Sequence, residues 1–180
     1  MTGTEQLKED HRLILSALGV LDVVAARIEA GSLPPPEHLG KLLRFLRVFA
    51  DEYHHHKEEQ SLFPAMEAAG LAREGGPIAV MRAEHETGRA LTRGLFASAA
   101  ELAVQSAQER FVAAARHYSA HLRQHMAKED EILFHTAELQ LGLVQNDTLY
   151  ERFVSVEASR LPEGRPHWFR VVGELVAAYR

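Results

Sequence analysis

The chain carries one pattern twice, in two segments that lie 71 residues apart. The segment beginning at His54 reads HHHKEEQSLF, and the segment beginning at His125 reads HMAKEDEILF. Six of these ten positions are identical or exchange one acid for another. An acid–histidine pair precedes each segment, Asp10-His11 in the first half and Glu84-His85 in the second. The repeat predicts two equivalent helical hairpins related by a pseudo-two-fold axis, each with a histidine on its first helix and His-x-x-x-Glu on its second.

Almost every segment is predicted to be helical. Ala, Leu, Glu and Arg dominate, and no run of β-branched residues alternates with polar ones. Long helices are expected over about residues 4–30, 37–69, 77–104 and 107–141, with a kink or break at Pro64. The connections between them are short and contain Pro or Gly. The pattern therefore predicts an all-α, up-down-up-down four-helix bundle over residues 1–142.

Residues 143–180 are expected to form a helical C-terminal extension. Two short amphipathic pieces are split by Pro162-Glu163-Gly164. Phe153, Trp168, Phe169 and Leu175 provide apolar side chains with which the extension could pack on the bundle or on a partner subunit, so a homodimer is one expected arrangement.

The bulk composition excludes several classes of protein. The formal net charge of −5 argues against nucleic acid as a partner. No stretch approaches the ~20 apolar residues of a membrane span, and the first residues lack the apolar core of a signal peptide, so a cytoplasmic protein with no membrane partner is expected. The sequence has no cysteine, which excludes iron–sulfur clusters and thiolate zinc sites. Any metal must be held by nitrogen and oxygen.

The spacing within the repeat indicates a buried metal site. Residues four apart lie on one face of a helix, so His54 points the same way as Glu58, and His125 the same way as Glu129. Both stripes face the expected core, where an unpaired carboxylate is unfavourable, and no buried Lys or Arg is expected on them. Divalent metal ions would neutralise the carboxylates. The residues expected to converge are His11, His54, Glu58, His85, His125 and Glu129.

Two metal ions ~3.5–4 Å apart would fit this set, each with two histidines and sharing both glutamates as bridges. Imidazole and carboxylate ligands without thiolate favour iron, with manganese or zinc as substitutes. The zinc-protease motif is absent, because the first histidine of HLRQH, His121, is not followed by Glu. The Glu-x-x-His motif of ferritin-type di-iron sites occurs at residues 52–55, but the fourth helix has none.

At these residues the chain resembles the hemerythrin-like (HHE cation-binding) family, over about residues 5–140. The resemblance lies in Glu9-Asp10-His11, in HHHKEEQSLFP from His54, in residues 76–85, and in HMAKEDEILF from His125. It implies a di-iron centre with an oxo or hydroxo bridge. It also implies that the six residues named above are the ligands, with Glu58 and Glu129 as bridges.

The chain departs from the oxygen-carrying hemerythrins, which have a fifth histidine in a His-x-x-x-His pair on the third helix. The residue four before His85 is Met81, and a His-x-x-x-His pair occurs instead on the fourth helix, as His121 with His125. His121 is therefore either a fifth ligand or a residue that orients another ligand.

Other positions in the repeat also leave alternatives open. Glu59 competes with Glu58 as the bridge, because His55 and Glu59 are also four residues apart; the match to Lys128-Glu129 favours Glu58. His55 and its neighbour at position 56 point away from the stripe of His54, so we expect them in solvent or outside the ligand set.

The resemblance implies a protein that binds oxygen, nitric oxide or peroxide, in sensing, storage or stress response. The alternative is a di-iron oxidoreductase acting on nitric oxide, peroxide or oxygen, or a role in iron–sulfur cluster repair. A third hypothesis is a partner-binding module in which metal orders the bundle and the C-terminal tail carries the signal. That hypothesis predicts that residues 146–180 are dispensable for iron binding.

Overall fold

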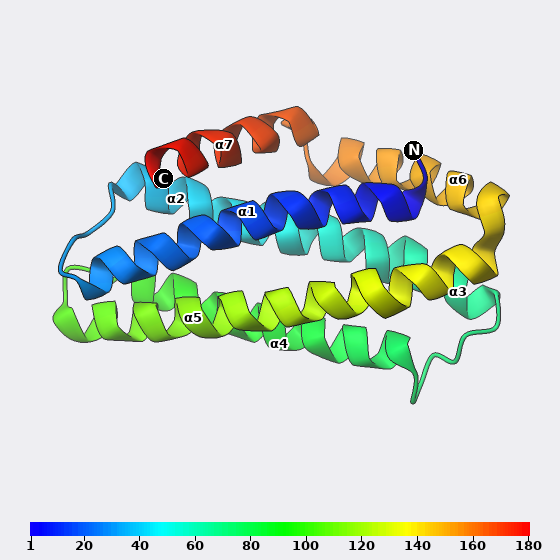
Figure 1. Ribbon diagram of the computed structural model, residues 1–180, viewed down its shortest axis with the longest axis horizontal. Helices are drawn as coiled ribbons and strands as arrows, with labels where there is room; N and C mark the ends of the chain where they lie inside the picture. The colour runs from blue at the N-terminus through cyan, green and yellow to red at the C-terminus, as the bar shows by residue number, and fades with distance from the viewer.

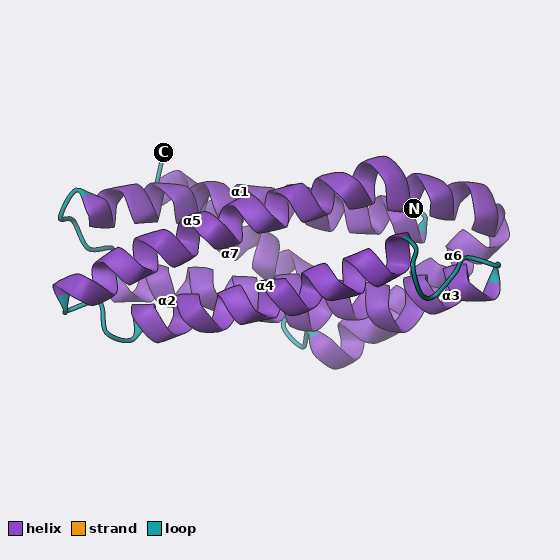
Figure 2. Cartoon of the chain, turned by 90° about the horizontal axis from the view of Figure 1, so that it is seen from below, coloured by secondary structure: helices purple, strands orange, loops and turns teal.

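The computed structural model describes residues 1–180, apart from the side chain at position 143. Every regular element in the described chain is a helix, with no strand among them (Figure 2). The α-helices are α1 Gly3–Glu29, α2 Pro36–Phe45, α3 Phe63–Ala68, α4 Pro77–Ala99, α5 Gln105–Lys128, α6 Phe134–Arg160 and α7 Gly164–Ala178. Three π-helical segments lie between them, η1 Leu46–His55, η2 Glu58–Leu62 and η3 Glu129–Leu133.

Four long helical segments lie side by side along the long axis of the molecule (Figure 1). α1 and α4 are two of them. The third runs from α2 through η1 and η2 into α3, and the fourth runs from α5 through η3 into the first part of α6. The α1–α2 and α4–α5 connections lie at one end of the bundle and the α3–α4 connection at the other (Figure 1). The expected helix ranges agree to within a few residues, except that α4 ends five residues earlier, in a turn where Val104 N–H donates to Glu101 O.

A kink or a break was expected at Pro64; the helix is not broken there, and a π-turn precedes the proline. Phe63 N–H donates to Glu58 O, five residues back, and Phe134 N–H donates to Glu129 O in the same way. A π-turn inserts one residue into a helix and is frequent at functional sites. Both π-turns start at the glutamates of the repeat.

The apolar core has two clusters. The larger includes Ile14, Phe49 and Trp168, and the smaller includes Leu7 and Phe63. His11 lies on α1 between Leu7 and Ile14, about one turn from each, so the polar residues of the repeat lie where the two clusters meet.

The C-terminal extension packs on its own chain. At Gly142 the backbone takes φ 64°, which glycine adopts without strain, and α6 changes direction there. The rest of α6 lies against α1 so closely that a Cβ on Gly3 would be 2.8 Å from the Cβ of Leu149. α7 packs on α1 and α2, and Phe153 and Trp168 are buried in the core.

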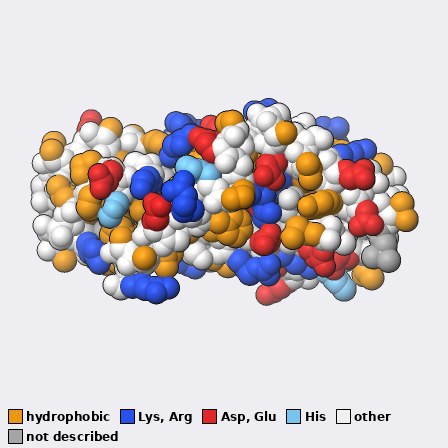
Figure 3. Space-filling model, turned by 90° about the horizontal axis from the view of Figure 1, so that it is seen from above, with side chains coloured by type: hydrophobic (Ala, Val, Ile, Leu, Met, Phe, Trp, Pro, Cys, Tyr) orange, Lys and Arg blue, Asp and Glu red, His pale blue; other side chains and the backbone are white. Residues whose placement is uncertain are grey.

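The face covered by α6 and α7 carries basic and acidic side chains interspersed with small apolar patches (Figure 3). Among the described residues, no helix is both long enough and apolar enough to cross a membrane.

Candidate metal centre

Six of the seven predicted site residues come together inside the bundle. They form two groups, in each of which the candidate ligand atoms lie within 4.8 Å of one another. Both groups contain Glu58 and Glu129; His11 and His54 complete the first group, and His85 and His125 complete the second. All six side chains are buried.

Glu58 lies between the two groups and directs one carboxylate oxygen to each. Its Oε1 is 3.7 Å from Nε2 of His54, and its Oε2 is 3.3 Å from Nε2 of His85. Neither oxygen has a hydrogen-bond partner. A buried carboxylate in this state is unfavourable unless a cation lies beside it.

Glu129 is placed in the same way from the opposite side. Its Oε2 is 3.3 Å from Nε2 of His11, and its Oε1 is 3.1 Å from Nε2 of His125. These two oxygens are also buried without a hydrogen-bond partner. The two glutamates therefore face both histidine pairs with all four of their oxygens.

Each of the four histidines turns its other ring nitrogen, Nδ1, toward a carboxylate on a neighbouring helix. An ionised carboxylate only accepts hydrogen bonds, so in the neutral form of each ring Nδ1 carries the proton and Nε2 presents a lone pair to the centre. The Nδ1–oxygen distances are 2.9 Å for His11–Asp130, 3.3 Å for His54–Asp10, 2.7 Å for His85–Glu59 and 3.0 Å for His125–Glu84. Metal-binding histidines in proteins almost always have such a partner.

These partner carboxylates follow the internal repeat. Glu59 and Asp130 hold equivalent positions in the two halves, and so do Asp10 and Glu84. The repeat therefore duplicates the residues around the centre as well as the residues inside it. Glu59 binds Nδ1 of His85 and the guanidinium of Arg89, and the structure places Glu58, not Glu59, among the converging atoms.

The geometry fits a metal ion. Ligands at about 2.0–2.1 Å from an ion stand about 2.9–3.3 Å apart when their bonds make angles between 90° and the tetrahedral angle. Nε2 of His11 lies 3.0 Å from Nε2 of His54, and Nε2 of His125 lies 3.1 Å from Glu129 Oε1. Nε2 of His85 and of His125 are buried without hydrogen-bond partners, like the glutamate oxygens.

The electrostatics of the metal-free form show how these charges balance without a metal. Burial disfavours the imidazolium of His11, but Asp130 and Glu129 outweigh it and raise the pKa of His11 to about 10. Burial disfavours the carboxylate of Glu129, yet His125 and His11 hold its pKa well below the usual range. A proton on His11 thus balances the charge of Glu129 in the absence of metal, and a metal ion must displace that proton.

Asp10 makes a buried ion pair that the sequence did not lead us to expect. Lys57 is completely buried, and its ammonium donates to Asp10 Oδ2. The guanidinium of Arg165, on α7, donates to Asp10 Oδ1 at 2.8 Å and 3.2 Å. Burial disfavours the carboxylate, but Lys57 and His54 outweigh it and the pKa of Asp10 falls below its usual range. Lys57 lies off the stripe of His54, which is why the search of the stripes for a buried cation did not find it.

His55 is buried, so it does not lie in solvent, which was one of the two places expected for it. Its ring stacks on His85 with centroids 4.0 Å apart, and it forms a third group with His85 and His125. Its Nδ1 lies 3.3 Å from Asp51, one turn earlier. The feature of the sequence that could have indicated a role for His55 is the Asp-x-x-x-His spacing from Asp51. Both residues lie in η1, where the ring of His55 turns inward. The equivalent position in the repeat is Met126, so the third histidine exists on one side only.

His121 lies outside these groups. Its Nε2 donates to the backbone oxygen of Glu84 at 2.9 Å, and its ring packs against Gly88. Since the Glu84 side chain accepts from His125, the structure places His121 behind a candidate ligand.

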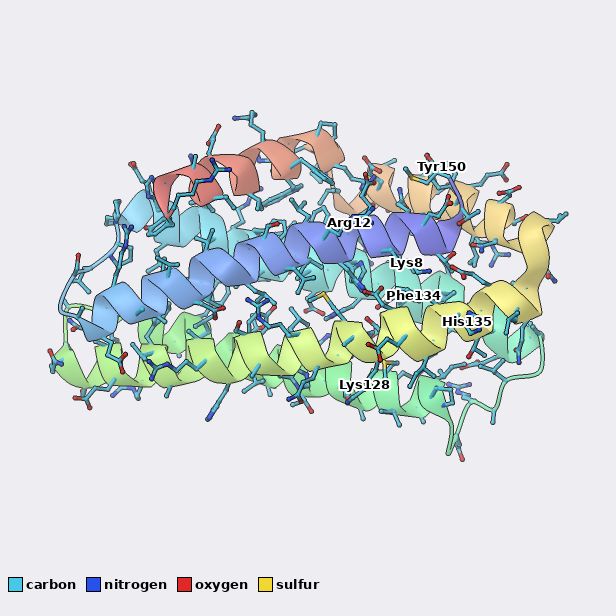
Figure 4. All side chains as sticks on the ribbon, in the orientation of Figure 1. Lys8, Arg12, Lys128, Phe134, His135 and Tyr150 are labelled. Carbon is cyan, nitrogen blue, oxygen red and sulfur yellow. The ribbon has the colours of Figure 1, made fainter. Side chains whose placement is uncertain are left out.

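Two aromatic rings close one end of the centre, again following the repeat. Phe134 stacks on His11 with centroids 5.3 Å apart, and its equivalent Phe63 stacks on His85 at 5.8 Å. Figure 4 shows Phe134 where α6 begins, with His135 next to it, and His135 is exposed. The rings shield the centre from water on this side.

The fold and the site define a helical bundle with a buried cluster of histidines and glutamates suited to metal. The chain belongs to the family described as the hemerythrin HHE cation binding domain, whose model matches residues 2–137. The family match thus covers nearly all of the four long helical segments and ends before the C-terminal extension.

Curated relatives include the uncharacterized protein Rv1995 of Mycobacterium tuberculosis (strain H37Rv) and the uncharacterized protein Mb2018 of Mycobacterium bovis. Each is 27% identical over 165 residues, which cover 91% of this chain and 64% of the relative. The chain therefore spans less than two thirds of the length of these relatives. No solved structure matches it.

Proposed function

We propose that the chain binds two iron ions in an up-down-up-down bundle, at a centre bridged by Glu58 and Glu129. The observation that carries the proposal is that each glutamate turns one unpartnered oxygen to each histidine pair. Two ions ~3.5–4 Å apart would use all four oxygens. The connections at alternating ends of the bundle support the helix order (Figure 1).

The proposed ligand of the centre is oxygen, nitric oxide or peroxide, bound in sensing, storage or stress response. Bound iron would supply redox chemistry and open coordination positions. With His55 included, the side of His85 and His125 offers three histidines, whereas the side of His11 and His54 offers two. The open position is therefore proposed on the side of His11 and His54.

A small apolar groove supports an uncharged diatomic ligand. It measures about 170 Å³ and is lined by Pro77, Val80, Met81, Lys128, Ile132 and Leu133. Met81 lies one turn before His85, and Leu133 lies one turn after Glu129, so the groove lies about one helical turn from the centre, beside Glu129. Glu129 also faces His11, on the side of the proposed open position. An apolar wall of this kind admits a diatomic gas more readily than an ion.

The test is metal content per chain by plasma mass spectrometry, with a visible spectrum, on protein produced with iron. The wild type is expected to hold about two irons per chain with a charge-transfer band. Glu58→Ala and Glu129→Ala should each lose most of the iron. Glu131→Ala, at an exposed acid two residues from Glu129, is the matched control and should keep it. Full retention of iron in both bridge variants would refute the bridging assignment.

The second candidate is a di-iron oxidoreductase acting on nitric oxide, peroxide or oxygen, with iron–sulfur cluster repair as a related role. The same two-histidine side favours it, since an open position can serve turnover as well as binding. Repeated consumption of substrate with a reductant would support the enzyme. A spectral change that stops at one equivalent per centre would support the binder.

A further inference from the structure

The two halves of the repeat differ at one point near the centre. In the second half, Glu84 accepts from Nδ1 of His125 and from Lys128, and both Glu84 and Lys128 reach solvent. In the first half, Asp10 accepts from Nδ1 of His54 and from Lys57 in the same relationship. Here the carboxylate and the lysine are completely buried, because the C-terminal extension covers them.

The extension adds a cation that has no equivalent in the second half. Arg165 lies in the first turn of α7, and its guanidinium donates to Asp10 Oδ1 and, at 2.8 Å, to Glu9. Its backbone N–H donates to Glu157 on α6, which fixes the start of α7 over this site. The planar fork of Arg suits such a two-carboxylate contact.

The two oxygens of Asp10 therefore have separate partners. Arg165 holds Oδ1, while Oδ2 faces the ammonium of Lys57 and Nδ1 of His54. If Arg165 were removed, Oδ1 would be a buried carboxylate oxygen without a partner, and the carboxylate would turn or draw in water. Oδ2 would then lose its position opposite His54.

We propose that Arg165 is a positioning residue of the metal centre: through Asp10 it holds the ring of His54, so that the His11–His54 metal position depends on the C-terminal extension. The His85–His125 position does not depend on it. This inference rests on the proposed function, and it extends the centre beyond residues 2–137, which the family model matches. It also opposes the hypothesis that residues 146–180 are dispensable for iron binding.

The extension also packs in the core through Trp168, so a variant could act merely by loosening α7. Three substitutions separate the two roles. Arg165→Gln removes the charge, and Arg165→Lys keeps the charge without the fork. Arg170→Gln, at an exposed arginine on the same helix that pairs with Glu174, is the matched control.

The first measurement is long-range proton–nitrogen NMR of the imidazoles in metal-free and zinc-loaded protein, with the spectra assigned by single histidine substitutions. Arg165→Gln should shift the ring nitrogens of His54 and leave those of His85 and His125 in place. Arg165→Lys should give a smaller shift. Glu84→Gln should do the reverse, shifting His125 and sparing His54.

The second measurement is extraction of zinc by a chelator. In Arg165→Gln the ion at the His11–His54 position should be lost about 10–100 times faster than in the wild type, the size of effect seen when a residue that orients a metal ligand is removed. The other ion should be lost at the wild-type rate. Arg170→Gln should match the wild type in both measurements. Unchanged His54 signals, or equal shifts in all the histidines with a lowered Tm, would overturn the proposal. Fewer than two ions in the wild type would count against the proposed function instead, and the metal-free NMR would still decide the role of Arg165.

Discussion

Nε2 of His11 lies 3.0 Å from Nε2 of His54, although each ring donates from Nδ1 to a carboxylate. Two imidazole lone pairs at this distance repel each other unless a proton or a metal ion lies between them. The same contact therefore describes two states of the protein. In the metal-free state the raised pKa of His11 keeps an extra proton on this ring, and in a loaded state an ion would take the place of that proton.

We predict that metal binding releases protons at neutral pH. The pKa of His11 in the metal-free protein is raised to about 10, so its ring carries an extra proton at pH 7.5 that an ion must displace. Zinc titrations by calorimetry, in buffers of different ionisation enthalpy, should report net proton release that decreases as the pH approaches 10. Heats that do not depend on the buffer would contradict the prediction.

The metal-free protein should lose stability as the pH rises. A raised pKa in the folded state means that the contribution of His11 is complete below its ordinary value of 6.5 and is lost as pH rises through about 10. The Tm of the metal-free wild type should fall across this window. His11→Gln should show a flatter profile, and His135→Gln, at an exposed histidine, should follow the wild type.

Equivalent substitutions in the two halves should lower the free energy of unfolding by different amounts. Asp10→Asn leaves the buried ammonium of Lys57 without its counter-ion and should destabilise the protein by about 3–5 kcal/mol. Glu84→Gln breaks a pair with the exposed Lys128, which should cost about 1 kcal/mol or less. Urea unfolding of the metal-free variants measures both. Equal losses would show that the extension does not isolate Asp10 from water.

His55 and His121 are the two candidates for a fifth histidine, and substitution should separate them. His55→Met introduces the residue found at the equivalent position of the repeat, and it should alter the visible spectrum and weaken one of the two metal positions. His121→Ala should leave the metal count unchanged, because this ring contacts the backbone of α4. If His121→Ala loses metal while His55→Met keeps it, the assignment is reversed.

Several features of this protein were readable in the sequence because they depend on local periodicity. The 3.6-residue period placed the helices, and a spacing of four put His54 with Glu58 and His125 with Glu129. The repeat then related one half to the other. These features require only that neighbouring residues share a helix face.

Other features were decided by the tertiary structure. Lys57 and Lys128 occupy the same position of the repeat, yet one is buried and the other exposed, because α6 and α7 cover only the first half. The inward turn of His55 depends on a π-helical segment, which shifts the phase of the helix. The contact between Arg165 and Asp10 joins residues 155 positions apart, and no local rule of spacing can predict it. Burial and long-range pairing depend on which surfaces the folded chain brings together, and that is settled only when the extension packs across the bundle.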